Sequence, residues 1–225
     1  MSEDREQTKY VLLAQARSIL TDLDNWGIDE LCVPIIEGSA AETLDDIQTD
    51  LGNCQRCGLA STRKNIVFGA GHPRARVVFV GEGPGRDEDQ QGYPFVGEAG
   101  KLLDRILAAM GLCRDEVYIC NVIKCRPPQN RNPNGDEISA CEPFLRRQLA
   151  VIKPQIIVAM GRFAAQTLLQ QQVAISKLRG TWYSYQDIPL MPTFHPAYLL
   201  RNPAGKREVW EDMKQVLRRL QQEDV

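Results

Sequence analysis

The chain has 225 residues, which is enough for one domain with a sizeable core and a small extension. Hydrophobic residues make up 43% of it and charged residues 25%, and no apolar run approaches about 18 residues, the length of a membrane span. The formal net charge of −2 gives nucleic-acid binding no support, and the first residues lack the basic start and apolar centre of a signal peptide. We therefore expect a cytoplasmic protein without membrane contact.

The first part of the chain is predicted to be an extension of a larger domain. Residues 7–23 place apolar side chains at helical spacing, which predicts an amphipathic helix, and residues 34–38 have the composition of a linker. Ser39 and Glu42 then form a capping box, which predicts a second short helix that delivers the chain to Cys54. We expect a helical extension and linker at residues 1–38 and one domain at residues 39–225.

A short apolar run at residues 77–80 ends in a turn rich in glycine. Its four β-branched or aromatic residues predict a strand covered on both faces, and Gly81, Gly83 and Gly85 allow a tight turn close to a ligand. Pro84 breaks the dinucleotide-binding fingerprint, and no lysine follows where a phosphate-binding P-loop needs one. The turn predicts either a ligand site at the carboxyl end of a strand or an ordinary exit into a loop.

Strands and helices alternate through the rest of the chain. Helices are predicted at residues 97–110, 136–152, 162–169 and 206–222, strands at 117–122 and 155–160, and a hairpin-like or strand region at 181–191. Three prolines and three asparagines make residues 124–135 a long loop, which in a compact domain is usually functional. This order predicts an α/β fold, a three-layer α/β/α sandwich with a central, mainly parallel four-stranded sheet.

Four of the seven cysteines have the spacing of metal ligands. Cys54 and Cys57 form a C-x2-C pair, and Cys125 and Cys141 follow across the proline-rich loop. Because the cytosol keeps thiols reduced, this pattern favours a metal site over a disulfide framework. The spacing alone leaves a zinc knuckle and an iron–sulfur cluster both open.

Together with the glycine turn and these cysteines, three further motifs carry a resemblance to a known family. They are Tyr93-Pro-Phe-Val-Gly97, Asn121-Val-Ile-Lys-Cys-Arg-Pro-Pro128 and His195-Pro-Ala-Tyr-Leu-Leu-Arg201. From about Cys54 to the C-terminus the chain resembles the iron–sulfur uracil-DNA glycosylases, usually called type 4. The resemblance implies a [4Fe–4S] cluster on Cys54, Cys57, Cys125 and Cys141, and an enzyme that hydrolyses the N-glycosidic bond of deoxyuridine in DNA. Its partners would be single- or double-stranded DNA and free uracil as product, and we expect a monomer.

The resemblance also implies roles in base recognition and catalysis. Phe95 would stack on the flipped uracil, the Asn121 amide would distinguish uracil from cytosine, and His195 would donate a hydrogen bond to uracil O2. The turn would complete the pocket. Its residues are Glu82, Gly83, Pro84 and Gly85.

The position of the attacking water is left open by the sequence. Gly83 stands where the first family of uracil glycosylases carries a water-positioning aspartate, so Glu82, Glu88 and Asp89 remain candidates. We expect Glu88 to exclude thymine. We also expect turnover rather than covalent capture, because the loop after the second strand contains no histidine.

Contacts to DNA are expected from the loops beside the pocket. Leu199 or Leu200 would fill the gap left by the flipped base, and Arg201 would hold a flanking phosphate. The basic run from Lys124 to Arg131, with Arg126, is expected to face phosphates, whereas Arg147 is expected on a solvated helix face.

Two other classes of function compete with this interpretation. A noncatalytic iron–sulfur protein that binds DNA or recruits repair partners would keep the cysteines and the basic loops. It would have no need of Phe95, Asn121 and His195 in their motifs. A zinc-dependent deaminase needs His-x-Glu followed by Pro-Cys-x-x-Cys, and this sequence lacks that signature.

Overall fold

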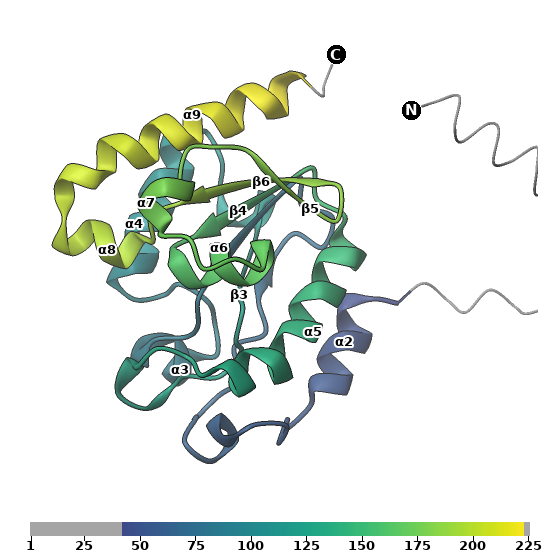
Figure 1. The fold of residues 1–225 in the computed structure, drawn as a ribbon. Helices are drawn as coiled ribbons and strands as arrows, with labels where there is room; N and C mark the ends of the chain where they lie inside the picture. The colour runs from purple at the N-terminus through teal and green to yellow at the C-terminus, as the bar shows by residue number, and fades with distance from the viewer. Residues whose placement is uncertain (1–41, 223–225) are drawn as a thin grey trace, which may run out of the picture. The chain divides into compact units, whose positions relative to one another are not determined.

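The computed structural model describes residues 42–222, and these residues fold around one mixed sheet (Figure 1). Within this part of the chain the sheet has six strands in the order β1-β3-β2-β4-β6-β5. The inner four, β3, β2, β4 and β6, are parallel, while β1 and β5 are antiparallel edge strands. The strands are β1 Ala70–Gly71, β2 Val77–Gly81, β3 Tyr118–Asn121, β4 Ile156–Met160, β5 Tyr183–Tyr185 and β6 Ile188–Thr193.

The prediction of an α/β fold with a mainly parallel sheet is confirmed, and the number of strands is larger than expected. The two additional strands are the edges, which contain two and three residues. Segments this short carry no alternating pattern that a sequence analysis can detect. The region predicted as hairpin-like at residues 181–191 forms β5 and β6, which are joined through Gln186 and Asp187, both with positive φ.

Helices cover both faces of the sheet. One face packs on α5 and α6, and the other packs on α4, α8 and α9. The helices of the described chain are α2 Leu44–Leu51, α3 Arg86–Gln91, α4 Glu98–Ala109, α5 Gly135–Ile152, α6 Arg162–Leu169, α7 Ile175–Leu178, α8 Pro196–Arg201 and α9 Lys206–Gln222. Among these residues no helix combines the length and apolar character required to cross a bilayer.

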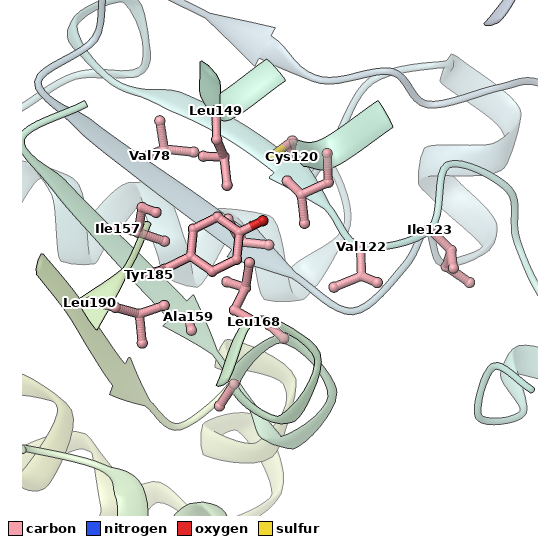
Figure 2. Close-up of a cluster of buried hydrophobic side chains, with 14 of the residues drawn as sticks. Val78, Cys120, Val122, Ile123, Leu149, Ile157, Ala159, Leu168, Tyr185 and Leu190 are labelled. Carbon is pink, nitrogen blue, oxygen red and sulfur yellow. The ribbon is translucent and has the colours of Figure 1, made fainter. Parts of the chain in front are cut away.

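The core between the sheet and α5 shows why the inner strands are apolar on both faces. Side chains of β2, β3, β4 and β6 meet those of α5 and α6, as Figure 2 shows for Val78, Cys120, Ile157, Leu149 and Leu168. Cys120 is the small buried hydrophobe that an apolar strand pattern predicts. Because both faces are covered, the ends of the parallel strands are the part of the sheet free to form a site.

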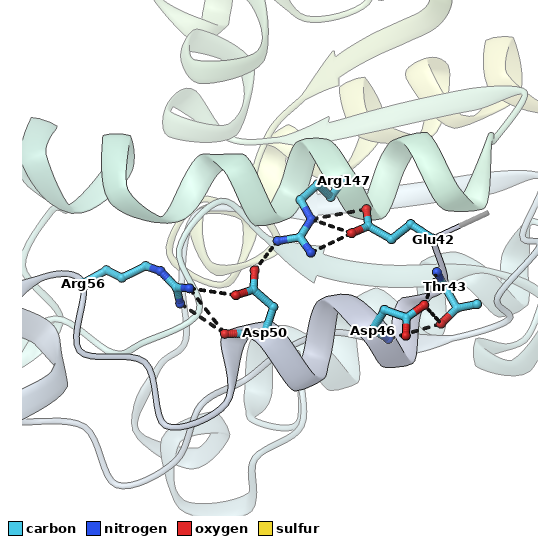
Figure 3. A network of polar contacts seen from close by, with 6 residues as sticks. All are labelled: Glu42, Thr43, Asp46, Asp50, Arg56 and Arg147. Atoms are coloured by element: carbon cyan, nitrogen blue, oxygen red, sulfur yellow. Dashed lines mark hydrogen bonds and ion pairs between the residues drawn. The ribbon is translucent and has the colours of Figure 1, made fainter. Parts of the chain in front are cut away.

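Helix α2 lies outside α5 and is fastened to it by an ion-pair network (Figure 3). The Arg147 guanidinium on α5 donates to Glu42 at 2.7 Å and also to Asp50, and Asp50 accepts from Arg56 at 2.9 Å. Arg147 therefore serves an internal contact of the fold. Arg56 in turn donates to the Cys54 sulfur at 3.6 Å, so the network reaches the C-x2-C pair.

Several boundaries differ from the predictions. Helix α2 begins at Leu44 with Thr43 as its cap, which exchanges hydrogen bonds with Asp46, so the capping box is not the predicted Ser39 and Glu42. The expected N-terminal extension and linker, residues 1–38, lie outside the described residues. Two short helices, α3 and α8, occupy stretches that were expected to be a turn and a loop.

Candidate functional site

A cavity of about 390 Å³ opens at the carboxyl ends of β2 and β3. It collects residues from the turn after β2 and α3, the loop before α4 and its first turn, the end of β3, the loop before α5, and α8 with its cap. The lining residues are Glu82, Gly83, Pro84, Gly85, Glu88, Phe95, Ala99, Asn121, Ile123, Pro127, Asn130, Arg131, Asn132, His195, Ala197, Tyr198 and Arg201. The predicted pocket residues are therefore brought together from four separate segments of the chain.

The turn after β2 is held against the segment that follows β3. Val122 N donates to Gly81 O at 2.9 Å and Ile123 N donates to Glu82 O at 3.1 Å, which extends the parallel pairing beyond the strands. A Cβ on Gly83 would lie 2.6 Å from the Ile123 side chain. Position 83, which the resemblance matches to a water-positioning aspartate, therefore has no room for a carboxylate side chain while Ile123 stays in place.

The two carboxylates of this wall have different environments. Glu88 caps α3, and its oxygens accept from the backbone nitrogens of Gly85 at 3.1 Å, Val96 at 2.9 Å and Gly97 at 2.9 Å. Glu82 is half-buried in the cavity wall, and burial raises its carboxyl pKa, while Arg162 acts in the opposite direction. Glu88 thus holds the loop before α4, whereas the Glu82 carboxylate faces the cavity with its electrostatic partner on α6. Asp89 is buried and accepts from Lys64 N and Asn65 N, away from the lining.

Phe95 forms an aromatic wall whose backbone is strained into place. Its φ is +54°, an unusual value for a bulky residue, and Arg114 donates to both the Pro94 and the Phe95 carbonyl oxygens. A Cβ on Gly100 would lie 1.8 Å from the Phe95 oxygen, so α4 must carry a glycine there. The ring stacks on His195 with the centroids 5.5 Å apart.

Asn121 places an unused acceptor in the cavity. The residue is 1% exposed, and its Oδ1 is the one buried side-chain oxygen or nitrogen within residues 42–222 that has no hydrogen-bond partner. A buried acceptor of this kind costs about 1–3 kcal/mol unless a ligand satisfies it. A ligand that donates a hydrogen bond to Asn121 Oδ1 at the end of β3 would therefore be bound favourably.

His195 is fixed as a neutral hydrogen-bond donor. It caps α8, and its Nδ1 accepts from Ala197 N at 3.1 Å, which leaves the ring proton on Nε2. Burial, together with the nearby Arg201 charge, lowers the pKa of His195 to about 4. At neutral pH this ring can therefore donate from Nε2 while carrying no charge of its own.

Helix α8 separates the two leucines that were candidates for the base-replacing wedge. Leu199 is 1% exposed and packs in the core below the sheet, whereas Leu200 is 42% exposed. The Leu199 alternative is therefore contradicted by its burial. Tyr198 and Arg201 lie on the cavity side of the same helix.

The basic run after β3 is less available to phosphates than its sequence predicts. Lys124 is fully buried, so the expectation that it faces DNA is wrong. Arg131 pairs with Glu137 at 2.6 Å and Arg126 donates to Asn130 at 2.7 Å, although both keep contact with the surface. These bonds shape the loop that forms one rim of the cavity.

The four spaced cysteines come from the segment after α2, the loop after β3 and helix α5, and form what we call the four-cysteine centre: Cys54, Cys57, Cys125 and Cys141. All four are free thiols. As they stand, no three metal-ligating side chains of residues 42–222 are grouped closely enough to hold a metal ion. Besides burial, charge on Cys57 would raise the thiol pKa of both Cys125 and Cys141, and charge on Cys54 that of Cys141, so the four cysteines lie within electrostatic range of one another.

Nitrogen donors surround this centre. Arg56 and Arg63 donate to the sulfurs of Cys54 and Cys125 at 3.6 Å each, and Lys124 N donates to the Cys141 sulfur at 3.2 Å. Burial raises the pKa of the Cys125 thiol to about 11. Four thiols with cationic and amide donors are the donor set that suits a group carrying negative charge on sulfur.

Some residues of the site had no signal in the sequence analysis. Ile123 and Tyr198 line the cavity, and although both stand inside motifs that carry the resemblance, no role was predicted for either. Helix α3 had only half of a capping-box signal, because Glu88 stands three residues after Gly85 and accepts from its nitrogen, but glycine has no side chain to cap the helix. The buried Lys124 had none, since its neighbours form a basic, polar run.

Comparison with known proteins places this geometry in one family. The family model described as the uracil DNA glycosylase superfamily matches residues 68–214. A type-4 uracil-DNA glycosylase of Archaeoglobus fulgidus is 44% identical over 78% of this chain and 92% of its own length. A second, of Thermotoga maritima, is 44% identical over 77% of this chain and 92% of its own length. A type-5 uracil-DNA glycosylase of Pyrobaculum aerophilum is 30% identical over 78% of this chain and 91% of its own length.

Proposed function

The chain belongs to the uracil DNA glycosylase superfamily as one of its type-4 members, and from that premise we propose how its residues excise uracil from DNA. The enzyme is a hydrolase of DNA repair. It takes a deoxyuridine out of the base stack, cleaves the N-glycosidic bond, and leaves free uracil and an abasic site. Flipping the base costs a few kcal/mol, which the pocket must return through specific contacts.

Base recognition rests on one observation, the unpartnered Asn121 Oδ1. Uracil presents N3–H as a donor and O4 as an acceptor, so one asparagine amide can accept from the first and donate to the second. Cytosine reverses both groups, and each mismatch in a dry pocket costs about 1–3 kcal/mol. The Phe95 ring supplies the stacking surface beside this amide, because both line the same cavity.

Bond cleavage leaves negative charge on the uracil ring and positive charge on the sugar. His195 donates from Nε2 to uracil O2, where this negative charge develops, because its Nδ1 is already occupied by the Ala197 amide. The neutral ring acts as a fixed dipole and transfers no proton. A single aimed donor of this kind typically contributes a factor of about 10²–10³ to the rate.

The water is assigned to Glu82. Its half-buried carboxylate lines the cavity, whereas the Glu88 oxygens are engaged with three backbone amides. Glu82 therefore orients the water and stabilises the positive sugar. For Glu88 we retain exclusion of the thymine methyl, because its carboxylate approaches Gly85 in the cavity wall, and Glu88→Ala is expected to release thymine from DNA.

The DNA strand crosses the rim of the cavity. Leu200, exposed on α8, enters the gap left by the flipped base, and Arg201 binds a flanking phosphate. Arg126 and Arg131 approach the backbone from the loop before α5. Both side chains already have hydrogen-bond partners within the loop, so the loop that contacts the DNA backbone is held in shape before DNA binds.

The four-cysteine centre is proposed to hold a [4Fe–4S] cluster. The fit rests on four free thiols and on the donors from Arg56, Arg63 and Lys124 N that point at three of their sulfurs. When bound, the cluster supplies a rigid cross-link between the segment before β1 and helix α5. Cys125 and Cys141 flank the loop at positions 126–134 and would thereby orient it, and this loop forms one rim of the pocket.

The test uses a labelled duplex with one uracil opposite guanine. The wild-type protein is expected to release uracil, and His195→Ala is expected to lose about 10²–10³-fold in rate while still binding abasic DNA. Asn121→Asp should lose uracil release more than DNA binding. His72→Ala, which changes an exposed histidine outside the lining, is the matched control and should match the wild type.

Binding without release in the wild type would support the noncatalytic accessory protein instead. Equal rates in the wild type and His195→Ala would remove the proposed role of the ring. A colourless wild-type protein that still releases uracil would contradict the cluster but leave the glycosylase intact, since the two claims have separate readouts.

A further inference from the structure

Lys124 is an ammonium group buried where the mechanism makes no use of it. It is 0% exposed, and its Nζ donates to the Asn121 carbonyl oxygen at 2.7 Å and to Gln148 Oε1 at 2.6 Å. Neither acceptor carries a charge. Burying an ammonium among neutral groups is expensive, so a countercharge or a specific task is needed to explain its presence.

The same residue contacts the four-cysteine centre. Lys124 N donates to the Cys141 sulfur at 3.2 Å, and Cys120 and Cys141 are the groups whose negative charge, once they are ionised, would favour its ammonium. Gln148, its second acceptor, lies on α5 two turns after Cys141. Lys124 therefore touches the helix that carries one cysteine ligand and the last residue of β3 at the same time.

The network continues into the sheet without reaching the pocket again. Gln148 Nε2 donates to the Tyr118 hydroxyl at 3.1 Å and to Phe68 O at 3.0 Å. Only the branch through Lys124 ends on Asn121, the residue whose amide faces the cavity. Hydrogen bonds in such a buried network hold their members in one arrangement, because every alternative leaves a polar group unpaired.

We infer that Lys124 is a positioning residue that couples the four-cysteine centre to Asn121, so that uracil is recognised at full strength only when both ends of this link are in place. The inference rests on the proposed function. Its charge is balanced by thiolates of the loaded centre, and its hydrogen bond fixes the main chain that carries the Asn121 amide. A misplacement of a recognition group by about 1 Å can cost about 10²-fold in rate.

The test is Lys124→Met, which keeps the side-chain volume and removes the ammonium. The single-turnover rate of uracil release is expected to fall about 10- to 100-fold. Affinity for abasic DNA should stay within about twofold, because phosphate contacts are unchanged. Iron content should be retained, and the reduction potential of the centre should become more negative, because a nearby positive charge is lost.

Tyr118→Phe is the matched control. It removes a hydroxyl from the same buried network without touching Asn121, so it should lower thermal stability and leave the rate of uracil release unchanged. Lys124→Gln serves as a second variant if the methionine protein does not fold. Its side chain is one bond shorter and cannot span both acceptors, so it should also lose rate.

Three results with the variants would overturn the inference, and so would a wild-type protein that contains no iron. They are a wild-type rate in a folded Lys124 variant, an equal loss of abasic-DNA affinity, and a Tyr118→Phe rate as low as that of Lys124→Met. The proposed function fails by a different result, a wild-type protein that releases no uracil. A wild-type protein without iron would remove the centre as one end of the link.

Discussion

The pocket and the four-cysteine centre are built on opposite principles. In the pocket, strand pairing holds Asn121, while a hydrogen bond from the Ala197 amide and contact with the Phe95 ring hold His195. In the four-cysteine centre, burial raises the pKa values of the Cys125 and Cys141 thiols. Under the proposed function, the pocket residues act as the protein alone arranges them, whereas the four-cysteine centre would be ordered by the cluster that it binds.

This difference predicts which property each group of substitutions should affect. A change in the pocket should reduce chemistry and leave the fold intact, because its polar groups act on the substrate. A change in the four-cysteine centre should loosen the packing of α2 and of the loop before α5, and should therefore reduce both thermal stability and the rate of uracil release. The predictions below measure how far this separation holds, beginning with the largest expected effect.

Cys141→Ser is expected to have the largest effect. Losing a structural metal ligand should cost about 4 kcal/mol or more of unfolding free energy, or roughly 8–16 °C in Tm for a chain of this length. Thermal denaturation and an iron assay measure the two consequences. Cys113→Ser, at an exposed cysteine outside the centre, is the control and should change stability by about 0.5 kcal/mol at most. An iron-loaded Cys141→Ser protein with a normal Tm would place the cluster elsewhere.

Glu82→Gln and Glu88→Gln should separate catalysis from structure within the pocket itself. Glu82→Gln should slow uracil release by about 10²-fold with an unchanged Tm, because the side chain faces the cavity. Glu88→Gln should lose about 1–3 kcal/mol of stability, because an amide group cannot accept at every bond to Gly85, Val96 and Gly97. Single-turnover rates and thermal denaturation give both numbers. If Glu88→Gln slowed uracil release and Glu82→Gln lowered stability, Glu88 would be the catalytic carboxylate and Glu82 the structural one.

The pH dependence should identify the group that limits the rate in acid. Burial raises the pKa of Glu82 above its ordinary 4.5, so the rate should fall as pH decreases through that raised value and the carboxylate is protonated. His195, with a pKa lowered by burial to about 4, takes up a proton only at the acid end of this range. Arg162→Met removes the cation that favours the ionised Glu82, and the acid limb should move to higher pH.

The control for this measurement is Arg86→Met, which removes an exposed arginine that does not act on Glu82. Its rate should fall at the same pH as in the wild type. An acid limb that is unmoved in Arg162→Met would show that Glu82 is not the titrating group.

The smallest effect is expected from Leu200→Ala. The exposed leucine contributes only by filling the space that the flipped base leaves in a duplex, so the rate on duplex DNA should fall by about tenfold. Single-stranded DNA has no stacked gap, and its rate should be unchanged. Parallel assays on the two substrates measure the ratio. An equal loss on both would assign Leu200 to the pocket wall instead.

The elements with strong periodicity could be predicted from the sequence, and those set by tertiary contacts could not. The strand at Val77–Gly81 and the helix at Lys206–Gln222 have bounds close to the predicted ones, because burial on two faces or on one stripe leaves a long pattern. The short helix Pro196–Arg201 was expected as a loop, since six residues carry too little pattern.

The candidate site divides in the same way. Phe95, Asn121 and His195 were predicted through the motifs that carry the family resemblance, and the cavity brings them together. The direction in which a side chain points was not available from the sequence. Lys124 lies in a basic run yet is buried, and of two adjacent leucines only Leu200 reaches the surface, because the fold decides which face of each element is covered.

The contact between Phe95 and Gly100 has an evolutionary consequence. Phe95 occupies a backbone conformation that suits glycine, and position 100 has no room even for a methyl group beside the Phe95 oxygen. A side chain at position 100 would clash with the Phe95 oxygen, and most changes at position 95 would remove the ring, so we expect neither position to change alone. Substitutions that alter the substrate range are therefore expected to be tolerated more readily at other positions of the cavity.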